Sequence, residues 1–129
     1  MRTLIIDDEQ PLRSALYKVF SSLGVCDQAE DGAQGLMLIK MALEKEPYDL
    51  IVLDIVLPEL SGQRIIKKLR ELEAKAGIDP LKEAKVVVVS GRQDEPTLLQ
   101  AFRNGATGWV NKPINPAKLL NNLKNLKIS

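Results

Sequence analysis

Residues 85–89 read Lys-Val-Val-Val-Val, and these four successive valines decide the fold class of the chain. Valine favours strands because its branched side chain packs well on a pleated surface. The run shows no alternation of apolar and polar residues, which is typical of a strand buried on both faces of its sheet. Strands of this kind occur mainly in parallel sheets that helices cover on both sides.

The rest of the chain repeats this strand character four times, with helix-like patterns in between. Residues 50–53, Leu-Ile-Val-Leu, are as continuously apolar as the valine run. Strands that alternate with helices favour a parallel sheet, so we predict an α/β fold built from five strand–helix units. The other four predicted strands are Thr3–Ile6, Val25–Ala29, Asp49–Leu53 and Gly108–Val110.

The helical patterns between the strands have recognisable ends. Gly24 is expected to stop the first helix. Asp31, Ser61 and Asn115 are predicted N-caps, and Pro116 suits the first position of the last helix. The apolar stripes expected to face the core are Leu12, Leu16, Val19, Phe20 and Leu23 in the first helix, Ile65, Leu69 and Leu72 in the third, and Leu119, Leu123 and Leu126 in the last.

The composition indicates one globular domain over residues 1–129, with 45% apolar residues. The formal net charge of +1 provides no field that would attract nucleic acid or an anionic membrane. No apolar run approaches the roughly 18 residues that span a bilayer, and no secretory signal is visible. We therefore expect a cytoplasmic protein with no membrane segment.

The numbers of histidine and cysteine residues limit the kinds of catalytic site, metal site and disulfide that the chain can form. The chain has no histidine, so any catalysis must proceed without an imidazole base or metal ligand. Cys26 is the only cysteine, which excludes an intrachain disulfide. It lies in a predicted apolar strand and is expected to be an inert, buried thiol.

Polar residues follow four of the five predicted strands. Asp7 and Asp8 follow the first strand, Asp54 the third, Ser90 the fourth and Lys112 the fifth. In an open parallel sheet, ligands bind beyond the carboxyl ends of the strands, so these side chains are expected to meet at one edge.

The residues at this edge point to a particular chemistry. Three crowded carboxylates need a counter-charge, and Lys112 supplies only one. A hard divalent cation such as Mg²⁺ prefers one or two carboxylates plus water. One carboxylate then remains as a nucleophile that can form an aspartyl phosphate, with Ser90 and Lys112 holding the phosphoryl oxygens.

These segments resemble the receiver domain of two-component response regulators, the CheY-like family. The matching motifs are IIDDE, VLDIVLPELSG, VVVVSG and VNKP, in that order along the chain, and AEDGAQGL also resembles the family. The resemblance implies a flavodoxin-like (βα)5 fold with a five-stranded parallel sheet of order 2-1-3-4-5 and helices on both faces. No output domain is expected after the last helix, so the chain is either a stand-alone receiver or a fragment of a longer protein.

The resemblance also implies roles for individual residues. Asp54 would be the phosphoacceptor, taking a phosphoryl group from a phosphohistidine. Asp8 would bind Mg²⁺ or Mn²⁺ directly, Asp7 largely through water, and Asp54 and the backbone carbonyl of Val56 would complete the protein ligands. Lys112 would contact the phosphoryl group, and the Lys112–Pro113 bond would be cis.

Further implications of the resemblance concern the switch and its partners. Ser90 would move toward the phosphoryl oxygens and let Trp109, where the family more often has Tyr or Phe, rotate inward. The surface of the fourth helix, fifth strand and fifth helix would then change. The implied partners are a sensor histidine kinase or phosphotransfer protein and an unknown downstream protein. Direct nucleic-acid or membrane contact is not expected, and the domain would be a monomer or a weak, phosphorylation-dependent dimer.

Three alternatives remain open at this point. Asp7 and Asp8 could merely cap the first helix, ahead of Pro11. The chain could be a pseudo-receiver, a binding module that is never phosphorylated. A haloacid-dehalogenase-like phosphohydrolase also uses an Asp nucleophile and Mg²⁺, but it needs an acid two residues later, where this chain has Val56.

Overall fold

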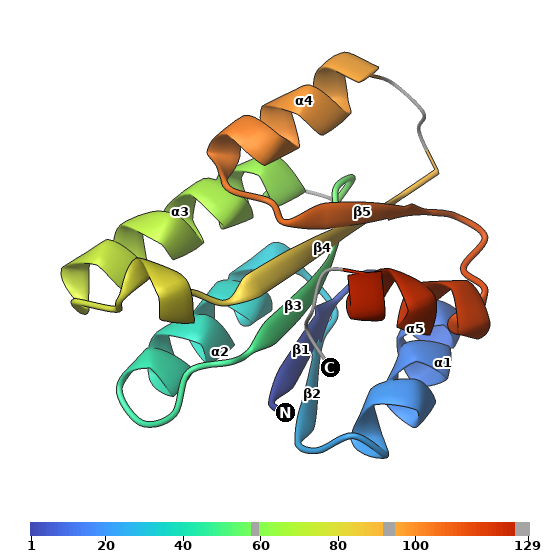
Figure 1. Ribbon diagram of the computed structural model, residues 1–129, viewed down its shortest axis with the longest axis horizontal. Helices are drawn as coiled ribbons and strands as arrows, with labels where there is room; N and C mark the ends of the chain where they lie inside the picture. Colours follow the sequence, from blue (N-terminus) through green and yellow to red (C-terminus); the bar gives the residue numbers. More distant parts are fainter. Residues whose placement is uncertain (58–59, 92–94, 126–129) are drawn as a thin grey trace.

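The computed structural model describes residues 1–57, 60–91 and 95–125, and it shows a five-stranded parallel sheet between two layers of helices (Figure 1). The strand order is β2-β1-β3-β4-β5, so the predicted flavodoxin-like topology is confirmed. Among the described residues, no helix is both long and apolar enough to cross a membrane. The elements are β1 (Thr3–Ile6), α1 (Gln10–Ser21), β2 (Cys26–Ala29), α2 (Gly32–Leu43), β3 (Leu50–Asp54), α3 (Gly62–Lys75), the 3₁₀ helix η1 (Pro80–Lys82), β4 (Lys85–Ser90), α4 (Glu95–Asn104), β5 (Gly108–Asn111) and α5 (Pro116–Asn125).

The core has two parts, one on each face of the sheet. Alternate residues of a strand point to opposite faces, so Ile5 and Ile6 of β1 belong to different parts. On one face, α2, α3 and α4 cover the sheet, with Ile39, Ile65, Leu69 and Ala101 among the buried residues. On the other, α1 and α5 contribute Leu16, Phe20, Leu119 and Leu123.

The predicted helix caps are confirmed. The side chain of Asp31 accepts a hydrogen bond from the backbone N–H of Gln34 at 2.8 Å. Ser61 accepts one from Arg64 at 3.4 Å, and Asn115 accepts one from Ala117 at 2.9 Å. Each bond satisfies a donor that the first turn of a helix leaves unpaired. Leu126, expected in the stripe of the last helix, lies outside the described residues.

Two expectations about burial are wrong. Helix α1 ends at Ser21, so Leu23 lies beyond it and is exposed instead of facing the core. Cys26 is only half-buried, because β2 is an edge strand and is not covered as the central strands are. Burial, with the nearby Asp27 charge, still raises the pKa of the Cys26 thiol to about 11, so the thiol stays protonated at neutral pH.

The segment after α3 is held in place by a buried carboxylate. Glu73 accepts a hydrogen bond from the backbone N–H of Ala84 at 2.8 Å and pairs with Arg70 at 2.6 Å. The Arg70 guanidinium also donates two hydrogen bonds to the carbonyl of Gly105, at 2.7 and 3.2 Å, and lies 3.4 Å from Glu83. This cluster therefore joins α3, the start of β4 and the turn between α4 and β5.

Two threonines, one without and one with a hydrogen-bond partner for its hydroxyl group, give a first prediction. Among the described residues, the Thr3 hydroxyl is fully buried and has no hydrogen-bond partner. The Thr107 hydroxyl, in contrast, accepts a hydrogen bond from the backbone N–H of Val86 at 3.0 Å. We expect Thr3→Val to raise the free energy of unfolding by about 1 kcal/mol, because it removes an unpaired polar group. Thr107→Val should lower it by about 1–3 kcal/mol, because it leaves the Val86 N–H unpaired.

Urea denaturation of both variants and the wild type measures the two changes in the free energy of unfolding. The two substitutions make the same chemical change, so each serves as the control for the other. Shifts of the same sign would contradict the role assigned to the two hydroxyls.

Candidate functional site

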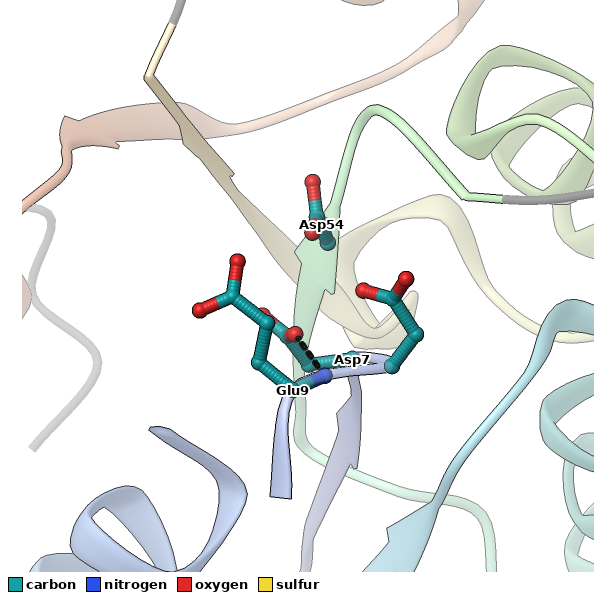
Figure 2. A group of neighbouring side chains, drawn as sticks. Asp7, Glu9 and Asp54 are labelled. Carbon is teal, nitrogen blue, oxygen red and sulfur yellow. Dashed lines mark hydrogen bonds between the residues drawn. The ribbon is translucent and has the colours of Figure 1, made fainter. Parts of the chain in front are cut away.

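The carboxyl ends of the strands bring the predicted site residues to one edge of the sheet. Asp7 directly follows β1, and Asp54 is the last residue of β3, which pairs with β1 through Ile6 and Leu53. Ser90 ends β4, and Lys112 directly follows β5. Figure 2 shows Asp7 and Glu9, from the segment after β1, beside Asp54 at the end of β3.

Lys112 links these acids. Its Nζ atom donates hydrogen bonds to Asp54 Oδ2 at 3.0 Å and to Glu9 Oε1 at 3.1 Å, and it lies 3.8 Å from Asp7 Oδ2. Asp7 and Asp54 are buried, with 1% and 4% of their surfaces exposed. Buried carboxylates are normally paired or bind a metal, and Lys112 is the cationic partner of both acids within the described residues.

Burial and neighbouring groups shift the pKa values of two residues in the site. Burial raises the pKa of Asp7 to about 6; the Glu9 N–H opposes this rise, and the Asp54 charge adds to it. For Lys112, burial acts to lower the pKa, but the hydrogen bonds to Asp54 and Glu9 outweigh it and raise the pKa. Four carboxylates face this one ammonium group, so the acids of the described site outnumber its cation.

The acidic cluster is suited to a hard cation. Within the described part of the chain, four acids each place one carboxylate oxygen within 4.8 Å of the others: Asp7, Asp8, Glu9 and Asp54. Such oxygen ligands are those that Mg²⁺ prefers. Asp7 and Asp8 were expected here; Glu9 was not assigned to the site from the sequence, although its position beside Asp8 was a usable signal.

The alternative role of Asp7 as a helix cap is not observed. Glu9 is the N-cap residue of α1, and its side chain makes no capping hydrogen bond. Asp7 Oδ1 accepts a hydrogen bond from the N–H of Glu9 itself at 2.8 Å, which Figure 2 marks with a dashed line. The Asp7 side chain is thus fixed toward the acidic cluster, not toward the first turn of the helix.

The remaining predicted residues surround Asp54 or follow β5. The N–H of Val56 donates to Asp54 Oδ1 at 2.9 Å, so both carboxylate oxygens of Asp54 are hydrogen-bonded. Ser90 is buried at the end of β4. The Lys112–Pro113 peptide bond is cis, as expected.

Trp109 lies on the outer surface of the molecule. Its residue surface is 44% exposed, and its ring meets that of Phe102 edge to face, with centroids 5.9 Å apart. The indole thus packs between β5 and α4 without entering the core.

Comparisons with known proteins agree with this geometry. Residues 3–124 match the family described as the response regulator receiver domain. The chain is 31% identical over 121 residues to the transcriptional regulatory protein DltR of Streptococcus agalactiae, covering 93% of this chain and 49% of that protein. It is 28% identical over 119 residues to the chemotaxis protein CheY of Thermotoga maritima, covering 92% and 91% of the two chains. The chain thus spans about half the length of some curated relatives and nearly all of others.

Solved structures show the same fold. A CheY-like receiver domain protein from Methanospirillum hungatei superimposes with a TM-score of 0.79 at 25% identity, covering 98% of this chain and 92% of that chain. The chain in a CheX–CheY–BeF3–Mg complex from Borrelia burgdorferi gives 0.84 at 24% identity, covering 100% and 90%. With the match over residues 3–124, this chain belongs to the response regulator receiver domain family of two-component systems.

Proposed function

We propose that this domain is a phosphoacceptor switch in which Asp54 takes a phosphoryl group from a phosphohistidine on a sensor kinase or phosphotransfer protein. The observation that carries the proposal is the buried Asp54 carboxylate at the sheet edge, with Lys112 Nζ at 3.0 Å and further acids beside it. Receiver domains belong to signalling proteins and are generally not enzymes, so the phosphorylated state itself is the product. We place this reaction in the cytoplasm.

A divalent cation, Mg²⁺ or Mn²⁺, fits the donor set. Asp7, Asp8 and Asp54 would hold it, together with the backbone carbonyl of Val56. The number of acids supports this assignment, because four carboxylates outnumber the single Lys112 ammonium group in the described site. When bound, the cation would neutralise charge on the entering phosphoryl group.

The residues of this chain would act on the transfer as follows. A carboxylate oxygen of Asp54 forms a bond to phosphorus while the P–N bond to the imidazole breaks, and the imidazole nitrogen keeps the electron pair. The Val56 N–H holds Asp54 Oδ1 during the approach. Lys112 then shifts its hydrogen bond from Asp54 to a phosphoryl oxygen, and Ser90 donates to another.

The output would pass through the face formed by α4, β5 and α5. Movement of Ser90 toward the phosphoryl group would make room for Trp109 to turn inward, which changes this face. The face already exposes large apolar side chains that a protein partner could cover, whereas the net charge of +1 offers nucleic acid no attraction. Its exposed apolar residues are Leu99, Phe102, Trp109 and Leu120. We propose a downstream protein as target, and a monomer or a weak dimer that forms on phosphorylation.

Phosphorylation by acetyl phosphate in the presence of Mg²⁺ tests the proposal. The wild type should gain one phosphoryl mass by intact-protein mass spectrometry, and Asp54→Asn should gain none, because the amide is not a nucleophile. Asp31→Asn is the matched control: it makes the same change at a helix N-cap, where asparagine caps equally well. Labelling of Asp54→Asn at the wild-type level would exclude Asp54 as acceptor. An unlabelled wild type would instead favour a pseudo-receiver.

A further inference from the structure

Glu9 occupies an unusual position among the acids of the site. It is the most exposed partner of Lys112, with 59% of its side chain accessible, whereas the other two partners are buried. Its Oε1 atom lies 3.1 Å from Lys112 Nζ, almost as close as Asp54 at 3.0 Å. Glu9 therefore restrains the ammonium group from the solvent side of the site, where a phosphodonor must enter.

The charge of the site depends on this residue. Four carboxylates and one ammonium group leave a net charge of −3, and one bound divalent cation reduces it to −1. Without the Glu9 charge, the cation-loaded site would be neutral. Asp8 and Glu9 are the two exposed carboxylates of the four. Because Asp8 is assigned to the cation, Glu9 is the exposed acid whose charge is left to act on molecules that approach from solvent.

We propose that Glu9 is a specificity-determining residue that selects phosphodonors by charge. It holds the Lys112 ammonium and keeps the cation-loaded site negative, so small donors with two negative charges are disfavoured relative to donors with one. This inference rests on the proposed function, since it concerns phosphorylation of Asp54.

The selection has two physical parts. The Glu9 carboxylate repels an anionic donor, and this repulsion doubles when the donor charge doubles. The same carboxylate holds one of the three N–H donors of Lys112, whose ammonium group must also reach the incoming phosphoryl oxygens. The repulsion makes a singly charged donor, such as phosphoramidate near neutral pH, less sensitive to Glu9 than the doubly charged acetyl phosphate.

The test compares the phosphorylation rates of Glu9→Gln and the wild type at saturating Mg²⁺. The saturating concentration is determined separately for each protein. Glutamine keeps the length of the side chain and an oxygen that can accept from Lys112, so only the charge is lost. We expect phosphorylation of Asp54 to become about 5-fold faster with acetyl phosphate and no more than about 2-fold faster with phosphoramidate. The gain should vanish in about 1 M salt, where the Debye length is about 3 Å.

Two control variants separate charge from structure. Glu9→Asp keeps the charge and should retain the donor preference of the wild type. Glu44→Gln makes the same change in net charge at the end of α2 and should leave both rates unchanged. Equal effects of Glu9→Gln on the two donors, an effect that persists in high salt, or a slower reaction would each overturn the inference. If the wild type gains no phosphoryl group on Asp54 from either donor, the proposed function itself fails.

Discussion

Arg70→Leu is expected to lower the free energy of unfolding by about 3–5 kcal/mol, because it leaves a buried carboxylate without its cation. The Glu73 side chain is only 4% exposed and pairs with Arg70 at 2.6 Å. Without the guanidinium, the Ala84 N–H would be the remaining hydrogen-bond donor to Glu73 among the described residues. The Gly105 carbonyl would also lose two hydrogen bonds, so the turn between α4 and β5 would be released from α3.

Chemical denaturation with circular dichroism measures this loss. Lys68→Leu is a matched control on the same helix, because Lys68 forms an exposed pair with Glu71 at 3.9 Å. Pairs of that kind contribute only about 0.3–0.5 kcal/mol, so this variant should remain close to the wild type. The double variant Arg70→Leu/Glu73→Leu should recover part of the loss, since it removes the unpaired charge as well. Similar stabilities for Arg70→Leu and Lys68→Leu would contradict the importance of the buried pair.

Gly62→Ala is expected to lower the free energy of unfolding by about 2–3 kcal/mol and to slow phosphorylation at least about tenfold. A β-carbon at Gly62 would lie 2.7 Å from the Cα atom of Ile55 and 2.8 Å from the carbonyl oxygen of Asp54. Both are backbone atoms, so they cannot yield as the end of a side chain can. The end of β3 would have to shift, and Asp54 would shift with it.

Gly91→Ala provides the control for this substitution. It lies next to Ser90 at the same edge of the sheet, but among the described residues the nearest neighbour of a β-carbon there would be Lys112, at 4.0 Å. We expect a change in stability below about 1 kcal/mol and ordinary phosphorylation kinetics. Measurements of unfolding free energy and time courses of phosphorylation by acetyl phosphate on both variants test this prediction. A Gly62→Ala protein as stable and as reactive as Gly91→Ala would show that the close approach is easily relieved.

Most of the fold could be predicted from local patterns. Each of the five strands lies within one residue of its predicted bounds, because continuous apolar runs and flanking turn residues are local signals. The strand order came from the family resemblance, since periodicity does not tell which strands are neighbours. The β2 strand shows that composition alone does not predict how deeply a strand is buried. Val25–Ala29 resembled a buried run, but its edge position leaves Cys26 half-buried.

The candidate site was predictable to the extent that its residues follow strands directly. Because parallel strands end at one edge of the sheet, the sequence alone predicts that four of these residues lie close together: Asp7, Asp54, Ser90 and Lys112. Glu73 could not be found in this way. It lies in a stretch rich in charged residues, which indicates a solvated helix face, and its partners Ala84 and Gly105 are brought near only by the tertiary fold. Glu9 was visible beside Asp8, but only the distance to Lys112 reveals its place in the site.

The division of the core by the sheet has a consequence for how substitutions combine. Ile5 and Ile6 are consecutive in the chain, yet one packs beneath α1 and α5 and the other beneath α2 and α3. The changes in unfolding free energy caused by two substitutions add when the two sites share no packing partners. They deviate from additivity when the sites share a cavity. Losses of side-chain volume at these two adjacent residues should therefore be nearly additive. Ile5 should instead couple to Leu119 of α5, more than a hundred positions away, with which it shares one part of the core.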